Sequence, residues 1–281
     1  MNSIKIKCPA KINLTLEIVN KREDGFHNIK SIMQMISLYD YLDIKKQDSK
    51  DTLILLSGNS KDIPYDEKNL VYKATKLFLE KTKKTAKIEI FIEKNIPISA
   101  GLAGGSTNAA GTLFGLNELF EKTLSRDELH ELCSQLGSDL NVCLEGGCIL
   151  ATSRGEVIKK IDGIKSDVTL IKPKDLGISA KEAYTKYAAK EFKPQNNMTE
   201  KMLKALDKKE DIQNLLYNDL EYAIFDDYKE LQEIKKALPN SIMSGSGSTY
   251  FVLDNIKPDL SDEYLCINGL EFVANGVSVI K

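Results

Sequence analysis

The feature that most constrains the fold of this chain is a glycine-rich stretch at residues 95–116. An alternating apolar run at residues 87–93 precedes it and predicts a half-buried strand, which ends at Pro97 because proline has no amide hydrogen to donate to a sheet. An alanine-rich run follows and predicts the start of a buried helix. The loop between them holds Gly101, Gly104 and Gly105. A strand, a glycine loop and a helix start together present unpaired amide groups and the positive end of a helix dipole to an anion.

This loop has neither of the two common nucleotide-binding spacings. A P-loop needs a lysine directly before the serine or threonine, and Gly105 occupies that place before Ser106. The glycines are also not spaced as in the GxGxxG fingerprint of dinucleotide-binding folds. A turn whose glycines only allow close packing of helix on strand therefore remains open as the alternative to an anion site.

The composition fits a globular protein and excludes several classes. The 281 residues are 42% hydrophobic and 28% charged, which allows one large domain or two ordinary ones with a sizeable core. The net charge of −2 does not fit a nucleic-acid-binding surface. No apolar run approaches the roughly 18 residues of a membrane span, and residues 1–14 lack a signal-peptide core. We therefore expect a cytoplasmic protein without a membrane segment.

The cysteines and histidines do not predict a metal site, a disulfide or a Ser-His-Asp triad. His27 and His130 are the only histidines and lie far apart in the sequence. The five cysteines are odd in number and lack CxxC spacing, so we expect small buried hydrophobes in a reducing compartment. They are Cys8, Cys133, Cys143, Cys148 and Cys266.

Strict alternation over residues 4–18 places Lys11 and Asn13 on the same face of a strand. The even positions are apolar and the odd positions are mostly polar, which predicts one face in the core and one face away from it. Pro9 either divides this run into two strands or marks an edge or bulge. If another layer covers the outer face, Lys11 and Asn13 form a polar site; otherwise they are ordinary surface residues.

Shorter signals predict the other elements. An Asp24-Gly25 turn separates two strand-like runs and precedes Phe26 and His27. Further early strands are expected at residues 29–39, 41–45 and 52–56. Helices are expected in four places, two of them opened by Ser-x-x-Glu capping boxes: residues 69–79, 125–136, 179–187 and much of 199–238. Residues 190–201 are polar and are expected to be a mobile connection, and a second glycine stretch covers residues 244–248.

Seven stretches of the chain together resemble the GHMP kinases, the superfamily of galactokinase, homoserine kinase and mevalonate kinase. Within it, the chain is most similar to the kinases of 4-diphosphocytidyl-2-C-methyl-D-erythritol. The first two of the stretches listed next distinguish this group from the other GHMP kinases. In family order, the stretches are PAKINL at 9–14, DGFH at 24–27, residues 96–110, GSD at 137–139, ISAKEAY at 178–184, NDLE at 218–221 and residues 243–248.

The resemblance implies a two-lobed α+β fold with the site in the cleft between the lobes. Residues 1–160 are expected to form an ATP-binding lobe like domain 2 of ribosomal protein S5, and residues 161–281 a ferredoxin-like lobe on the substrate side. The implied activity is ATP-dependent phosphorylation of the 2-hydroxyl of 4-diphosphocytidyl-2-C-methyl-D-erythritol, in the non-mevalonate route to isoprenoid precursors. ATP is the expected co-substrate with Mg²⁺. We expect no nucleic-acid or membrane partner, and a monomer or weak homodimer.

The resemblance also assigns roles to individual residues. Lys11 and Asp139 match the catalytic pair: Asp139 would accept the hydroxyl proton or orient that hydroxyl, and Lys11 would help to neutralise the transferred phosphoryl group. On its own, Asp139 beside a helix end is more typical of a cap. The expected nucleotide loop is Pro97, Ala100, Gly101, Leu102, Ala103, Gly104, Gly105, Ser106 and Thr107, with Ser106 also a Mg²⁺ ligand. The expected substrate residues are Asn13, Phe26, His27, Gly245, Ser246 and Gly247.

Four positions depart from the family pattern. Leu140-Asn141 stands where a Val-Pro pair is frequent, so we expect the backbone around Asp139 to be less fixed. Ala103 stands where glycine is frequent, which costs little unless that position needs a positive φ. Phe26 replaces the more usual tyrosine and keeps an aromatic face for cytosine while losing a hydroxyl.

Other hypotheses remain open beside this one. The chain is alternatively a GHMP kinase for another small alcohol, such as homoserine or mevalonate. A third hypothesis is a non-catalytic relative that binds a metabolite or a partner as a regulator. Such relatives commonly lose the catalytic base, and this chain has both Lys11 and Asp139. For residues 244–248, a plain flexible turn remains an alternative to a binding loop.

Overall fold

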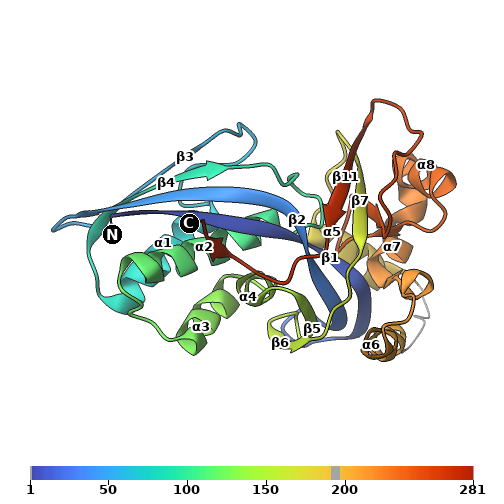
Figure 1. The fold of residues 1–281 in the computed structure, drawn as a ribbon, viewed down its shortest axis with the longest axis horizontal. Coiled ribbons are helices and arrows are strands. Elements are labelled where there is room, and N and C mark those ends of the chain that lie inside the picture. Colours follow the sequence, from blue (N-terminus) through green and yellow to red (C-terminus); the bar gives the residue numbers. More distant parts are fainter. Residues whose placement is uncertain (1, 191–196, 281) are drawn as a thin grey trace.

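The computed structural model describes residues 2–190 and 197–280, which form two lobes side by side (Figure 1). The first part of the chain contains β1 (Ser3–Lys21), β2 (His27–Asp48), β3 (Leu53–Gly58), α1 (Leu70–Thr82), β4 (Ala86–Glu93), α2 (Gly104–Leu119), α3 (Arg126–Leu136), α4 (Leu140–Glu145), β5 (Cys148–Thr152) and β6 (Val157–Ile161). The second part contains β7 (Asp167–Pro173), α5 (Ala180–Ala189), α6 (Met198–Lys208), β8 (Tyr217–Asn218), α7 (Asp219–Ile224), α8 (Lys229–Ala237), β9 (Ile242–Met243), β10 (Tyr250–Val252), β11 (Tyr264–Glu271) and β12 (Ser278–Val279).

The strands of the described residues form two sheets. The larger sheet has eight strands with the main path β12-β1-β2-β4-β3; in addition, β5 pairs with β2, β6 pairs with β5, and β8 pairs with β1. The smaller sheet has four strands in the order β11-β7-β10-β9. The chain passes from one sheet to the other between β6 and β7, and its last strand returns to pair with β1. The α+β class with two lobes that we expected from the sequence is confirmed.

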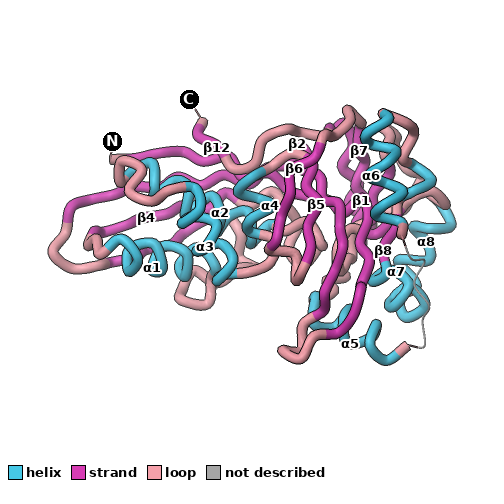
Figure 2. The backbone as a smooth tube through the Cα atoms, turned by 90° about the horizontal axis from the view of Figure 1, so that it is seen from below, coloured by secondary structure: helices cyan, strands magenta, loops and turns pink. Residues whose placement is uncertain are grey.

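A long antiparallel hairpin of β1 and β2 reaches from one lobe into the other (Figure 2). Pro9 does not divide β1 into two strands. The register against β2 shifts between Pro9 and Ala10, so of the alternatives left open by the sequence, a bulge is the one that the structure shows. The predicted break between strands at residues 29–39 and 41–45 is wrong, because β1 pairs with β2 on both sides of Asp40. The hairpin is therefore one continuous support for residues of both lobes.

Helices α1, α2 and α3 lie on one face of the larger sheet, and the opposite face is open in the same region (Figure 1). Two glycines allow α2 to approach β1 closely. A Cβ at Gly111 would lie 2.5 Å from Cys8 Sγ, and a Cβ at Gly115 would lie 2.9 Å from Ile6 Cγ1. The even-numbered residues of β1 that face this helix are buried, as their alternation predicted.

The capping signals predicted helix starts correctly. Ser125 opens α3 with both bonds of a capping box, and Ser179 accepts the amide of Glu182 in the first turn of α5. Asn69 caps α1 in the same way. Residues 199–238 are mostly helical as expected, although two 3₁₀ turns and β8 separate the helices: Gln213–Leu215 and Phe225–Asp227 are those turns.

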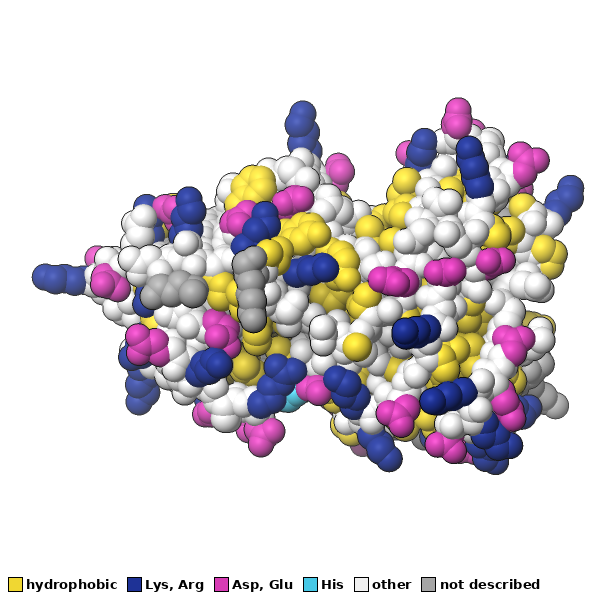
Figure 3. All heavy atoms as spheres, in the orientation of Figure 1, with side chains coloured by type: hydrophobic (Ala, Val, Ile, Leu, Met, Phe, Trp, Pro, Cys, Tyr) yellow, Lys and Arg dark blue, Asp and Glu magenta, His cyan; other side chains and the backbone are white. Residues whose placement is uncertain are grey.

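The surface and the cysteines agree with the composition. On the face shown in Figure 3, charges of both signs are interspersed. No helix in residues 2–190 or 197–280 combines the length and the apolar character needed to cross a membrane. All five cysteines are free and all but Cys266 are buried. Of the expected connection at residues 190–201, positions 191–196 lie outside the described residues.

Buried Asp40 of β2 fixes the beginning of the glycine stretch. Its carboxylate is fully buried and accepts hydrogen bonds from the amides of Asn95 at 2.7 Å and Ile96 at 2.8 Å. It also forms an ion pair with the ammonium of Lys94. A buried charge needs such partners because its desolvation costs several kcal/mol. Asp40 therefore holds the end of β4 where the glycine loop starts.

We predict that Asp40→Ala destabilises the protein by about 3–5 kcal/mol, because Lys94 is then buried without a counter-charge. Urea unfolding of the wild type and the variant measures this difference. The double variant Asp40→Ala/Lys94→Met should be more stable than Asp40→Ala alone, since both charges are gone. If the single variant lost less than about 1 kcal/mol, the ion pair would be no more important than an exposed one.

Candidate active site

The first glycine stretch forms a loop that turns sharply before α2. Gly101 and Ala103 have positive φ angles of 73° and 58°. This left-handed conformation costs Ala103 roughly 1 kcal/mol, so the alanine at this position is not neutral. No side chain caps the start of α2 at Gly104. By helix geometry, the amides of its first turn lack intrahelical partners, as an anion site requires.

Two cavities lie on either side of this loop and share Gly101 and Ala103 in their walls. The smaller cavity has a volume of about 260 Å³ and is lined by residues 97–105 together with Ile63, Asn69, Ile92, Lys94 and Asn108. The larger has a volume of about 750 Å³. Its walls come from the β1–β2 hairpin, both glycine stretches, the segment before α4, the β5–β6 turn, α5 and α7.

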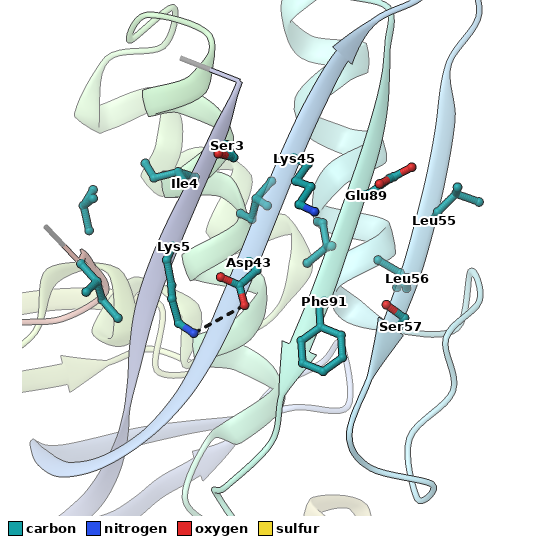
Figure 4. A pocket seen from close by; sticks show the side chains of 14 residues that line it. Ser3, Ile4, Lys5, Asp43, Lys45, Leu55, Leu56, Ser57, Glu89 and Phe91 are labelled. Atoms are coloured by element: carbon teal, nitrogen blue, oxygen red, sulfur yellow. Dashed lines mark hydrogen bonds and ion pairs between the residues drawn. The ribbon is translucent and has the colours of Figure 1, made fainter.

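A still larger but shallow hollow of about 880 Å³ lies on the open face of the larger sheet (Figure 4). It contains the ion pair of Lys5 and Asp43, 3.5 Å apart, beside the half-exposed Phe91. None of the residues predicted for the site line it. We place the candidate site at the 750 Å³ cavity because the buried lysine, the carboxylate and both glycine stretches converge there.

Lys11 lies almost fully buried in the wall of the larger cavity, with 3% of its side chain exposed. Its ammonium donates hydrogen bonds to Asn13 Oδ1 at 2.7 Å and to the carbonyl of Gly101 at 3.1 Å. The Oδ2 atom of Asp139 is 3.6 Å away. Asp139 is 30% exposed and lines the same cavity. This end of the cavity therefore presents an oriented cation and a solvent-accessible carboxylate side by side.

Asn13 is held by its own partners. Its amide nitrogen donates to Ser31 Oγ at 2.8 Å, and Ser31 in turn donates to the carbonyl of Thr15 at 2.6 Å. All three residues are buried. The polar face of β1 is thus covered by other layers, which is the condition under which the sequence predicted a polar site.

The second glycine stretch packs directly on the first. Ser244 Oγ donates to the carbonyl of Gly101 at 3.0 Å, and a Cβ at Gly101 would lie 2.0 Å from the Ser244 carbonyl oxygen, so only glycine fits there. Asn218 supports the second stretch, since its amide nitrogen donates to the carbonyls of Met243 at 2.7 Å and Gly245 at 2.8 Å. The two loops are fixed against each other.

Aromatic side chains gather in another part of the cavity wall. The His27 ring stacks on the Tyr184 ring with centroids 5.1 Å apart and an interplanar angle of 19°. Phe26 is 52% exposed, and the Arg154 guanidinium lies 5.0 Å from its ring centroid. A half-exposed ring with a cation beside it offers a flat surface for a planar ligand.

Burial and nearby charges perturb the titration of two of these residues. Burial lowers the pKa of His27 below its ordinary value of 6.5, and the charge of Lys21 lowers it further, so the imidazole is neutral at pH 7. Burial raises the pKa of the Tyr184 phenol well above 10, and the charges of Asp139 and Asp219 raise it further. Both rings are therefore uncharged at neutral pH.

Most residues assigned from the sequence line these two cavities. Those in the smaller cavity are Pro97, Ala100, Gly101, Leu102, Ala103, Gly104 and Gly105. Those in the larger are Lys11, Asn13, Phe26, His27, Gly101, Ala103, Ser106, Asp139, Gly245 and Ser246. Two residues line neither: Thr107 is fully buried inside α2, and Gly247, with a φ of 85°, packs against Met243. The roles of all these residues remain predictions.

Several residues of the cavity walls were not predicted from the sequence. Tyr184 belongs to a face of α5 that also carries Lys181, Thr185 and Ala188 into the larger cavity. That i, i+3, i+4, i+7 spacing inside a predicted helix was the available signal. Arg154 and Lys21 had no such signal, because their place depends on how two distant turns pack together. On the smaller cavity, Asn69, Lys94 and Asn108 were also missed.

The described residues contain no group of three or more His, Cys, Asp or Glu side chains arranged to hold a metal ion. In kinases, Mg²⁺ is commonly bound by only one or two protein oxygens together with substrate phosphates. Asp139 and Ser106 both line the larger cavity and supply oxygens of this kind. The site therefore fits Mg²⁺ that arrives with a nucleotide, and not a metal held by protein ligands alone.

The chain is similar to known proteins in sequence and in fold. The GHMP kinases N terminal domain matches residues 69–148, which include the glycine loop and Asp139. A 4-diphosphocytidyl-2-C-methyl-D-erythritol kinase of Clostridioides difficile (strain 630) is 42% identical over 268 residues, covering 92% of this chain and 89% of that protein.

Two solved structures are similar over nearly the whole chain. One is a crystal structure of 4-(cytidine 5'-diphospho)-2C-methyl-D-erythritol kinase, with a TM-score of 0.77 and 27% identity, covering 96% of this chain and all of that one. The other is a homoserine kinase from Cytophaga hutchinsonii, with a TM-score of 0.78 and 18% identity, covering 100% and 98%. The second likeness concerns the fold alone. With the sequence relationship above, these findings show that the chain belongs to the 4-diphosphocytidyl-2-C-methyl-D-erythritol kinase family of the GHMP kinases.

Proposed function

We propose that this protein transfers the γ-phosphoryl group of ATP to the 2-hydroxyl of 4-diphosphocytidyl-2-C-methyl-D-erythritol, giving the 2-phosphate and ADP for isoprenoid precursor synthesis. One observation carries the proposal: a single cavity of about 750 Å³ contains the Lys11–Asp139 pair and also the aromatic group of Phe26, His27 and Tyr184. A substrate with a reactive alcohol and a cytidine needs both. Coupled-assay turnover of this substrate with Mg·ATP tests it directly.

ATP is assigned to the glycine loop and the smaller cavity. The uncapped start of α2 favours negative charge, and the positive φ angles of the loop turn its backbone around the phosphates. The proposed contacts are Pro97, residues 100–105 and Ser106, with Asn69 and Lys94 added from the cavity wall. Thr107 would contribute through its place in the helix turn and not through its buried hydroxyl. Ser106 would hold the Mg²⁺ that arrives with the nucleotide, and this ion would help to neutralise the charge of the phosphates.

Lys11 and Asp139 are assigned to the chemistry. Asp139 accepts or orients the proton of the attacking hydroxyl, because it is the accessible carboxylate of the cavity. Lys11 cannot swing away, since its ammonium is bonded to Asn13 and Gly101. A fixed cation next to the acceptor stabilises the charge that develops during phosphoryl transfer. Asn13, Gly245 and Ser246 are assigned to the methylerythritol part, and Gly247, which lines neither cavity, is assigned to the shape of the second glycine stretch.

Phe26, His27 and Tyr184 are assigned to the cytidine. Phe26 offers an aromatic face, and neutral His27 offers one ring nitrogen as a donor and one as an acceptor. The cationic wall residues Lys21, Arg154 and Lys181 complement the diphosphate that joins the two parts of this substrate. The sequence relatives of this chain are kinases of the cytidyl compound, and this favours that substrate over another small alcohol such as homoserine or mevalonate. The aromatic group is the feature that favours a cytidyl compound.

We further propose that the protein works in the cytoplasm as a monomer or weak homodimer, with lobes at residues 1–160 and 161–281. The free, mostly buried cysteines support a reducing compartment. The passage of the chain from the larger to the smaller sheet after Ile161 supports the boundary. The return of β12 and β8 to the larger sheet means that the two lobes share strands across it.

We predict that Asp139→Asn lowers kcat by about 10²–10⁴-fold, because the amide cannot accept the proton of the hydroxyl. The Kd for ADP should stay within about twofold of the wild type. Asp127→Asn, at an exposed position in the first turn of α3, is the control and should leave kcat unchanged. Full turnover by Asp139→Asn would remove Asp139 from the mechanism, and turnover by neither wild type nor variant would favour the non-catalytic hypothesis.

We predict that Phe26→Ala raises the KM for the cytidyl substrate about tenfold, since stacking of a base on an aromatic ring contributes about 1–3 kcal/mol. The KM for ATP should not change. Phe91→Ala removes a similarly exposed phenylalanine from the open sheet face and is the matched control. Steady-state kinetics measure both constants. Equal activity on the alcohol without its cytidyl group would contradict the substrate proposal.

We predict a pH dependence of substrate binding that comes from His27. Because its pKa lies below 6.5, the ring is mostly neutral between pH 8 and pH 7, and KM for the cytidyl substrate should be nearly constant over this range. KM should rise as the pH falls through the lowered pKa and the acceptor nitrogen becomes protonated. His27→Gln should have a higher KM that no longer changes in this way. A wild-type KM that already rises between pH 8 and 7 would rule out this role.

A further inference from the structure

Asn141 is a buried amide two residues after Asp139, in the first turn of α4. We propose that Asn141 is a positioning residue that ties the Asp139 segment to the β5–β6 turn, residues 153–156, and through that turn to Phe26. The inference rests on the proposed function, because it concerns how the two ends of that substrate site are held relative to each other.

The segment around Asp139 needs an external anchor. Helix α4 has only six residues, and the Asp139 side chain makes no capping bond to it. So short a helix is not stable by itself. Asn141 supplies the anchor: its amide nitrogen donates to Ser134 Oγ of α3 at 2.9 Å and to the carbonyl of Glu156 at 2.8 Å. Its oxygen lies 3.1 Å from His130 Nδ1 of α3.

These contacts overturn an expectation from the sequence. Without the frequent proline, the backbone around Asp139 was expected to be less fixed. Asn141 is 4% exposed and both ends of its amide are bonded, so the segment is held by side-chain hydrogen bonds instead. A proline would restrict the local backbone but has no group that reaches Glu156. The asparagine therefore adds a tether between two segments.

The tethered turn is itself closely organised. The Glu156 carboxylate accepts the amide of Arg154 at 2.8 Å and the hydroxyl of Ser153 at 3.0 Å. Gly155 packs on the residue before Asp139, since a Cβ at Gly155 would lie 3.3 Å from Ser138 Cβ. The turn and the Asp139 segment are thus joined by a hydrogen bond and by direct packing.

The same turn contacts the hairpin turn that carries Phe26. The Arg154 guanidinium lies over the Phe26 ring, 5.0 Å from its centroid. Arg22 Nη1 donates to Ser153 Oγ at 3.2 Å, and Arg22 pairs with Asp24 at 3.0 Å. A continuous series of contacts therefore runs from Asn141 through residues 153–156 to Phe26. Both ends of the substrate should respond when the Asn141 contact is lost.

The test compares two leucine substitutions of buried asparagines. Asn141→Leu keeps the branched shape and the number of side-chain heavy atoms and removes the hydrogen bonds. Asn117→Leu is the matched control, because Asn117 of α2 is 5% exposed and likewise ties a loop, by bonds of 2.9 Å to the amide and carbonyl of Leu124. Both variants lose stability, since buried partners are left unpaired. Only the first should alter the kinetics toward the substrate.

For Asn141→Leu we expect kcat to fall about tenfold and KM for the cytidyl substrate to rise about fivefold, because small displacements of reacting groups are costly. KM for ATP should stay within about twofold. Asn117→Leu should lower the melting temperature without changing any of the three constants. Unchanged kcat and substrate KM in Asn141→Leu, or equal changes in both variants, would overturn the proposal. If Asn141→Leu does not fold, Asn141→Ser carries the same comparison.

Amide hydrogen exchange separates this inference from the proposed function. In Asn141→Leu, the amides of Arg154 and Gly155 should exchange at least about tenfold faster than in the wild type, whichever alcohol is the substrate. Unchanged exchange there would refute the tether itself. Suppose that exchange is faster in the variant but the wild type phosphorylates homoserine and not the cytidyl compound. The proposed role of Asn141 would then stand, and the proposed substrate would be wrong.

Discussion

The buried ammonium of Lys11 is the constraint on which the arrangement of the site depends. Removing such a cation from water costs several kcal/mol, so its neighbours must supply oxygens at fixed positions. They are Asn13 on the same strand, the Gly101 carbonyl of the first glycine stretch and the carboxylate of Asp139. The need to surround this ammonium with oxygens brings three segments of the chain together, and the first and the last of them are more than 120 residues apart in the sequence.

The contact of Gly101 with Ser244 connects the surroundings of Lys11 to the second lobe. The same contact limits both glycine stretches to small residues. The fold does not decide the substrate, since the homoserine kinase and the cytidyl-substrate kinase match this chain with nearly equal TM-scores of 0.78 and 0.77. What distinguishes them must lie in the side chains that line the cavity. In this chain, the side chains proposed for that role are the aromatic group at Phe26 and His27 and the nearby cations.

The sequence predicted the local parts of this site and missed those made by distant packing. The alternation of β1 placed Lys11 and Asn13 off the core face, and the glycine stretch predicted the loop before α2 that lines both cavities. Neither pattern indicates which layer covers that face. Tyr184 lay within a quoted motif, but only its helical spacing pointed to the cavity. Arg154 could not be predicted from the sequence, because it contacts Phe26 only after two turns, about 130 residues apart in the chain, pack against each other.

The bulges of the hairpin explain how residues far apart on one strand line the same cavity. Lys11 and Lys21 are ten residues apart on β1, and an extended strand would separate them by ~33 Å. Both nevertheless line the same cavity of about 750 Å³. The register against β2 shifts between Asn13 and Thr15 and again between Ile18 and Asn20, and each bulge bends the strand. Period-2 alternation assumes a straight strand, so a sequence pattern that placed Lys11 correctly had no means of showing that Phe26 returns to the same cavity.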